Sequence, residues 1–240
     1  MAAHVTFVCI LLILSPVKTW AQDYGEAARW LLKAEGFLDV YGGPSIGGTA
    51  DVSVSERTSS ETRSAQASID LSSAAAFGIR AGLWFPTYNW IGFGMDLGYL
   101  KADGPGVNID AYPLSFLLAL RAPLFATPDR PGGRLQPYAM GGISLYAMDA
   151  SVRYDGMGGS TSIGKWYLDS SSPVAGPYLA AGLTWAPSVN IAVFAEYRYV
   201  HFNVGFDTTN SYILPTANGR VDTSVTTRLL LFGVSYRFLK

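Results

Sequence analysis

The chain has 240 residues, of which 49% are hydrophobic, 13% are aromatic and only 15% are charged, with a formal net charge of −1. Soluble domains of this size carry about a quarter charged residues, so the apolar surface must lie in a large core or in a bilayer. No stretch concentrates Lys and Arg to neutralise phosphates, and we therefore expect no nucleic-acid partner.

The first predicted element is a secretory signal peptide over residues 1–21. It contains an apolar run at 5–14, which is shorter than the roughly 20 residues of a spanning helix, followed by a proline and a small residue at the cleavage position. The only cysteine, Cys9, lies in this run, so a mature chain that starts at Gln22 cannot form disulfides. Residues 22–35 are predicted as an N-terminal periplasmic segment, for which a short helix and the start of the first strand both stay open.

From residue 36 on, the dominant hydrophobic period is two, with breaks at Gly, Pro, Asn, Asp and Ser. Eight runs are predicted as strands: 36–55, 67–85, 90–102, 108–124, 135–153, 174–186, 189–206 and 221–238. The mostly long, polar connections are 56–66, 103–107, 154–173 and 207–220, and the mostly shorter, proline-rich ones are 86–89, 125–134 and 187–188. This alternation predicts an all-β fold over 36–240, an eight-stranded antiparallel up-and-down transmembrane barrel with its short turns in the periplasm.

The alternation separates an apolar face from a face of small and charged residues. In the second run, Phe77 and Ile79 share one parity and Gly78 and Arg80 the other, and the third run places Asp96 on the polar parity. About ten ionisable residues of balanced sign are too few for eight strands that face water, but they suit a narrow barrel interior. The apolar face is therefore predicted to contact lipid, while barrel closure satisfies the backbone hydrogen bonds.

The polar parity also predicts an interior charge network. Arg80 and Asp96 should lie opposite each other across the turn 86–89, with Cβ atoms about 4.5 to 5.5 Å apart. The predicted network comprises Asp70, Arg80, Asp96, Arg121, Glu196 and Arg198. The alternative is that water satisfies these side chains in a polar lumen. In the run 135–153, Met140 and Ile143 fall on opposite parities, so neither face is assigned there.

Aromatic residues gather near the short turns and the end of the chain, as an interfacial girdle requires. The predicted girdle comprises Trp84, Tyr88, Trp90, Trp185, Tyr236 and Phe238. The alternative is that these are ordinary aromatic residues of a sheet.

Several segments resemble the eight-stranded outer-membrane barrels of Gram-negative bacteria, in particular the opacity-protein and OmpA-like porin-family group. These segments are 77–86, 90–99, 136–138, 196–199 and 233–238. The last is similar to the signal read by the barrel-assembly machinery, although Leu239 and Lys240 follow Phe238.

The resemblance implies an outer-membrane location, contact with outer-membrane lipid, and a packed interior that conducts poorly or not at all. It also implies a role as a structural anchor, surface antigen or adhesin, with an unidentified extracellular ligand at the four long loops. We expect a monomer.

Two other classes compete with this interpretation. In lipid A deacylases a His activates a Ser two residues later, whereas His201 is followed at that position by Asn203. We therefore expect no enzyme and no catalytic residue, and the absence of metal-binding motifs and phosphate-binding loops predicts no metal and no cofactor. A soluble lipocalin-like ligand carrier would need an apolar interior and a charged exterior, the reverse of the predicted phase.

Overall fold

The computed structural model describes residues 33–57, 62–71, 75–104, 107–154, 161–167, 174–207 and 218–238. The strands are β1 (Glu35–Arg57), β2 (Thr62–Leu71), β3 (Ala75–Trp84), β4 (Ile91–Gly104), β5 (Val107–Arg121), β6 (Leu135–Tyr154), β7 (Thr161–Tyr167), β8 (Val174–Trp185), β9 (Ile191–Asp207) and β10 (Asn218–Phe238). No helix in this described part of the chain is long and apolar enough to cross a membrane. The predicted signal peptide lies outside the described residues, and β1 begins one residue before the predicted start of the barrel.

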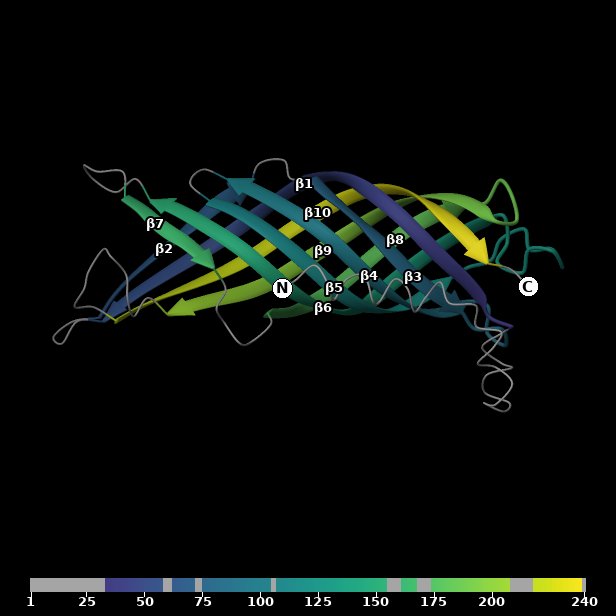
Figure 1. Cartoon of the computed structure of the whole chain (residues 1–240), viewed down its shortest axis with the longest axis horizontal. Helices are drawn as coiled ribbons and strands as arrows, with labels where there is room; N and C mark the ends of the chain where they lie inside the picture. Colours follow the sequence, from purple (N-terminus) through teal and green to yellow (C-terminus); the bar gives the residue numbers. More distant parts are fainter. Residues whose placement is uncertain are drawn as a thin grey trace.

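The strands form one closed antiparallel sheet (Figure 1). Neighbours in the sequence pair around the barrel, and β1 closes it by pairing with β10 from Gly36 and Phe238 to Arg57 and Asn218. On the other edge of β1 lie both β2 and β3, and one edge of β6 pairs with both β7 and β8. β2 and β3 therefore occupy one strand position of the barrel, and β7 and β8 occupy another. Counted in this way, the ten strands form the eight-stranded barrel that the sequence predicted.

The sheet reaches further at the long-loop end than the sequence indicated. β1 continues to Arg57 and β2 starts at Thr62, so most of the predicted connection 56–66 is strand. The predicted connection 154–173 contains β7. Both β2 and β7 lie at one end of the barrel, and the C-terminal end of β10 lies at the other, with the short turns (Figure 1).

A β-bulge in β1 reverses which face of the strand points inward. The register slips between Ser45 and Gly48, because three steps along β1 match two steps along β10. Gly47, within the bulge, has a φ of 133°, a conformation that side chains rarely adopt. Before the bulge the odd-numbered residues are buried, as Tyr41 shows, whereas after it Ala50 is buried. Side chains alternate between the two faces along a strand, so one extra residue makes all the residues after it point to the other face.

β2, which pairs with the part of β1 after the bulge, shows the same reversal, and the prediction for Asp70 is therefore wrong. Residues paired across an antiparallel ladder point to the same side of the sheet. In β2, Ile69 pairs with the buried Ala50, and Asp70 pairs with Thr49. Asp70 is consequently exposed on the outer face and Leu71 is buried, although β3 keeps the predicted phase with Arg80 buried.

The structure assigns the face that the sequence left open in β6. Met140 is buried inside the barrel, and Ile143 is 60% exposed on the outside. Even-numbered residues from Gln136 to Met148 point inward without interruption.

Glycines in β3 and β4 make room for large side chains that β1 sends into the lumen. A Cβ atom on Gly78 would lie 2.4 Å from the Tyr41 hydroxyl oxygen, and one on Gly82 would lie 2.5 Å from the Phe37 ring. The alternation of glycine with apolar residues in these strands thus reflects a narrow interior, in which side chains of the adjacent strand β1 lie over the glycines of β3.

This close approach predicts that Gly78→Ala destabilises the barrel by about 1 to 3 kcal/mol, because overpacking forces neighbouring groups to shift. The measurement is denaturant unfolding of the refolded protein in detergent. Gly141→Ala is the matched control, since its Cβ would meet its nearest neighbour, Leu179, at an ordinary 3.7 Å. Equal unfolding midpoints for the two variants would contradict the packing described here.

Candidate functional site

Eight acidic and basic side chains are buried inside the described barrel. Each is no more than 9% exposed, and they comprise four carboxylates and four guanidinium groups: Glu35, Asp39, Asp96, Glu196, Arg80, Arg121, Arg198 and Arg237. We call them the interior charge cluster. Since the numbers are equal, the cluster is neutral with every member ionised, as burial of charge requires.

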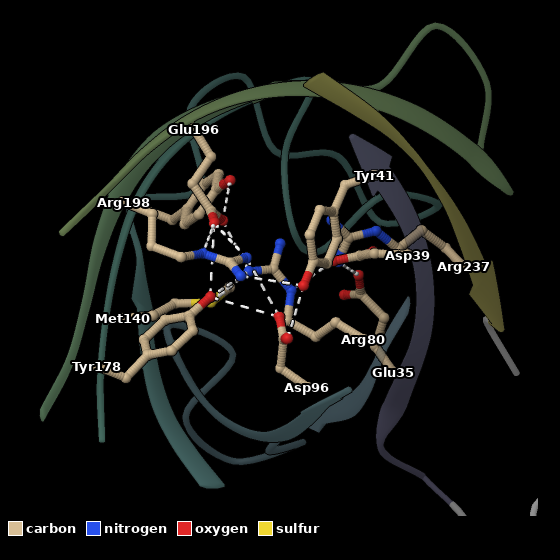
Figure 2. Close-up of polar contacts among 11 residues, drawn as sticks. Glu35, Asp39, Tyr41, Arg80, Asp96, Met140, Tyr178, Glu196, Arg198 and Arg237 are labelled. Atoms are coloured by element: carbon tan, nitrogen blue, oxygen red, sulfur yellow. Dashed lines mark hydrogen bonds and ion pairs between the residues drawn. The ribbon is translucent and has the colours of Figure 1, made fainter. Parts of the chain in front are cut away.

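Glu196 bridges two arginines at the centre of the cluster (Figure 2). Its Oε2 accepts a hydrogen bond of 2.7 Å from Nη1 of Arg80, and its Oε1 accepts one of 2.7 Å from Nη2 of Arg198. Nε of Arg80 also donates to Asp39 at 2.9 Å. Tyr138 donates its hydroxyl hydrogen to Oε2 of Glu196 at 2.9 Å. The carboxylate therefore receives charge-assisted hydrogen bonds at both oxygens.

Arg198 connects Glu196 with Asp96 across the lumen. Its Nη2 lies 3.2 Å from Oδ2 of Asp96, and its Nη1 donates to the Tyr41 hydroxyl oxygen at 3.0 Å. The same hydroxyl donates to Oδ1 of Asp96 at 2.7 Å. The guanidinium carbon lies 4.5 Å from the Tyr41 ring centroid and 4.7 Å from that of Tyr178, which is cation–π distance.

A second group of the cluster lies at the short-turn end. Arg121 makes a bidentate pair with Glu35, with nitrogen–oxygen distances of 2.8 and 2.6 Å. Nη1 of Arg237 lies 3.5 Å from the same carboxylate. The Arg121 guanidinium also sits 4.2 Å above the ring centroid of Trp84. Bidentate pairing and stacking both need the planar guanidinium of arginine.

The predicted register around the first turn is confirmed, but the predicted ion pair is not. Arg80 and Asp96 are partners across the β3–β4 ladder, and both are buried. Arg80 nevertheless pairs with Asp39 and Glu196, while Asp96 pairs with Arg198. Asp39 is the direct partner of Arg80 across the β1–β3 ladder, whereas Arg80 reaches Glu196 across the narrow lumen, so only one of its two ion pairs follows from the backbone register.

The structure brings together four members of the predicted network and separates two. Arg80, Asp96, Glu196 and Arg198 meet at the centre, whereas Arg121 joins the group at the short-turn end. Asp70, as described above, is outside.

Sequence reasoning left Glu35, Asp39 and Arg237 out of the network. Asp39 and Arg237 were counted among the ionisable residues of the predicted interior but were not assigned to the network, and both are buried inside the barrel. Glu35 had been assigned to the segment before the barrel. The tyrosines that line the cluster were missed, although Tyr41 lies two residues after Asp39 and thus on the same face.

One member of the predicted aromatic girdle is placed wrongly. Trp84 is 3% exposed and points into the lumen, because it has the inward parity of Arg80. The other members lie on the outer face near the short turns, each about half exposed: Tyr88, Trp90, Trp185, Tyr236 and Phe238.

Two cavities adjoin the centre of the cluster. Both are small, with room for about one water molecule each: one is lined by Arg198 with Tyr41 and Tyr178, and the other by Arg80 with Asp39. The two share no lining residue. Glu196 pairs with Arg198 of the first cavity and with Arg80 of the second, so these ion pairs lie between the two cavities. Within the described residues, no group of three His, Cys, Asp or Glu side chains is arranged to hold a metal ion.

Comparison with known sequences identifies the family. A family profile described as "outer membrane protein beta-barrel domain" matches residues 7–238. The chain belongs to this outer-membrane β-barrel family. The protein therefore resides in the outer membrane, as its sequence predicted.

Solved structures show the same fold in other outer-membrane barrels. OprG from Pseudomonas aeruginosa is 15% identical, with a TM-score of 0.53 over 87% of this chain and 98% of that one. AlkL, solved in lipid bilayers, is 12% identical, with a TM-score of 0.50 over 85% and 90%. Neisserial surface protein A is 17% identical, with a TM-score of 0.44 over 85% and 97%. Among curated proteins, none matches this sequence significantly.

The outer face of this outer-membrane barrel carries an apolar band of the height that a bilayer needs. In β10 the outward residues are apolar from Phe238 to Leu230, and Arg228 is the next outward residue. At about 3.4 Å per residue and a tilt of about 40°, this stretch rises about 20 Å, close to the roughly 25 Å of outer-membrane barrels. In β4 the band ends at Tyr99, and Lys101 follows.

The shared carboxylate predicts strong coupling between Arg80 and Glu196. A double-mutant cycle with Arg80→Ala and Glu196→Ala should give a coupling energy of about 1 to 3 kcal/mol, the range for groups in one buried network. Denaturant unfolding in detergent measures it.

The cycle for Arg80→Ala and Asp96→Ala should give a smaller value, because these two groups are not paired. The exposed pair of Lys101 and Asp103, 3.7 Å apart, is the control, with an expected coupling of about 0 to 1 kcal/mol. If Arg80 and Glu196 couple no more strongly than this surface pair, the described cluster does not stabilise the barrel.

Proposed function

We propose that this barrel is a non-conducting membrane anchor that presents its long-loop end at the cell surface to bind other molecules. The observation that carries the proposal is the interior charge cluster, whose buried ion pairs fill the lumen. An anchor needs a stable barrel rather than a passage, and eight strands leave room for side chains alone.

The short-turn end adds to the closure. The turn between β5 and β6 packs against one member of the cluster, since Gly132 is buried and a Cβ there would lie 2.5 Å from Nη1 of Arg121. The side chain of Asn89 donates to the carbonyl of Pro131, and that of Arg130 to the carbonyl of Ala186. All three short turns are therefore tied together at this end.

The long-loop end has the character of a domain in water. Beyond the apolar band, outward side chains such as Asp51 and Asp222 are polar, while inward ones such as Ala50, Leu100 and Phe202 are apolar and buried. This is the reverse of the phase in the membrane. The strands thus project from the bilayer as a small water-exposed barrel, a rigid support for the loops, and loops on a rigid support are where binding commonly resides.

Planar-bilayer recordings test the closure. The purified protein should show no large, stable conductance, because the Glu196 ion pairs separate the two cavities. Removing both partners with Arg80→Ala and Glu196→Ala keeps the interior neutral and should allow small ions to pass.

The control is the neutral double variant of Lys101 and Asp103, which should stay silent. Heat-dependent gel mobility must show that each protein is folded before recording. Large conductance from the unaltered protein would refute the proposal, as would conductance from the control equal to that of the interior variant.

We also propose that the protein is not a lipid-modifying enzyme, although one contact favours that alternative. Nδ1 of His201 lies 3.0 Å from the Thr226 hydroxyl oxygen, which supplies the hydroxyl that Asn203 lacks. A hydrolase needs, in addition to a base and a hydroxyl group, a group that orients the base and hydrogen-bond donors that stabilise the oxyanion. The contact between His201 and Thr226 by itself supplies neither.

Mass spectrometry of lipid A incubated with the purified protein tests this second proposal. The acyl chains should stay intact with the unaltered protein and with Thr226→Ala alike. Loss of an acyl chain that stops in Thr226→Ala would establish an enzyme instead.

A further inference from the structure

Arg228 is a charged residue on the lipid-facing side of the barrel, at the level where the apolar band ends. It is exposed and follows Leu230 on the outer face of β10. On β4 the first cation beyond the band, Lys101, is paired with Asp103. No described acid lies within ion-pair distance of Arg228. A cation at this height meets the headgroups of the outer leaflet, where an arginine matches phosphate geometry.

Two further hydrogen-bonding groups lie beside Arg228. Tyr199 is its direct partner across the β9–β10 ladder, and His201, two residues on, is the partner of Thr226. The contact between Nδ1 of His201 and the Thr226 hydroxyl fixes the imidazole and leaves Nε2 for an outside ligand. The rings of Tyr199 and His201 are stacked with an interplanar angle of 15°. A guanidinium, an imidazole and a phenol thus share one small area of the outer face.

The bulge of β1 leaves room on the other side of Arg228. Ser45 of β1 pairs with Leu229 of β10, and Gly48 pairs with Thr227, so the slip in the register lies beside Arg228. Within that slip Gly47 has no side chain, and a Cβ there would meet nothing within 4 Å. The other residue of the slip, Ile46, is 54% exposed, so on the side of β1 the surface beside Arg228 consists of a glycine and an apolar side chain that a lipid can contact.

Apolar side chains continue directly below this area toward the periplasm. Leu230 and Tyr197 are partners across the β9–β10 ladder, and Leu179, the partner of Tyr199 in β8, is 52% exposed. The surface thus combines cationic and hydrogen-bonding groups above with an apolar track beneath. An amphiphile with an anionic headgroup matches both parts, whereas a free anion would use only the upper one.

We propose that Arg228, Tyr199 and His201 form a binding site for the phosphate headgroup of an outer-leaflet lipid, whose acyl chains lie along Leu230, Tyr197 and Leu179. The site depends on the position of the barrel in the outer membrane and not on the conductance or the loops. It would fix one lipid against the β9–β10 side of the barrel.

The test is a titration of the folded, full-length mature protein in neutral detergent with bisphosphorylated lipid A, in which native mass spectrometry counts the bound lipid. Arg228→Gln should weaken binding about tenfold, in line with the loss of a charge-assisted hydrogen bond. Tyr199→Phe should weaken it less. Lys101→Gln, which removes a cation at a similar level on β4, should leave it unchanged. Removing the phosphates from the lipid should have the same effect as removing the guanidinium. The unaltered protein should therefore bind lipid A without phosphates no more tightly than Arg228→Gln binds bisphosphorylated lipid A.

Three results would overturn the proposal. Equal binding by the unaltered protein and Arg228→Gln would show that the guanidinium is not a ligand. An equal loss in Lys101→Gln would show general attraction between charges. Displacement of lipid A by an equal concentration of inorganic phosphate would show a site for free phosphate. Heat-dependent gel mobility of each variant establishes that it is folded.

Discussion

Charges that leave water inside a lipid-embedded barrel must neutralise one another, and the rest of this structure depends on that constraint. Removing one partner of a buried pair costs about 3 to 5 kcal/mol. The interior charge cluster meets the constraint with equal numbers of acids and arginines, which come from strands far apart in the sequence. Glu196 shows how few groups are needed, since one carboxylate serves both Arg80 and Arg198. The glycines that face the cluster leave the space in which the long side chains can meet.

The strands pass from the lipid bilayer into water, and the face of the sheet that carries the apolar side chains differs between these two environments. Within the bilayer the apolar side chains point outward, and beyond it they point inward. In β1 the change is made by the bulge at Gly47, which reverses the phase of the strand. In β10 it is made by composition alone, since odd-numbered residues stay inside while Leu229 and Val225 replace charged groups in the lumen. The level of these changes coincides with the level at which Arg228 appears on the outside.

The sequence was enough to predict the closed barrel, the inward face of most strands and the register around the first turn. These features follow from a period of two and a short turn, both of which are local. The contacts of Arg80 could not be predicted from the first turn alone, because Asp39 depends on the register between β1 and β3, which are not consecutive strands, and Glu196 lies across the lumen. Asp70 was misplaced because no local pattern reveals a phase reversal made in a neighbouring strand. Trp84 was misplaced because its type suggested the interface, although its parity with Arg80 indicated the lumen.

The order of the charges along the chain bears on how the barrel can assemble. β1 contributes two acids, Glu35 and Asp39, and each later strand of the cluster adds at most one net charge. Any sheet that starts at β1 and lacks β10 therefore has a net negative interior. Neutrality arrives with Arg237, on the strand whose pairing with β1 also closes the barrel. A partly built sheet would leave at least one interior carboxylate without an arginine, and that carboxylate would have to be protonated in order to enter the bilayer. The strand that closes the barrel is thus also the strand that completes its ion pairs.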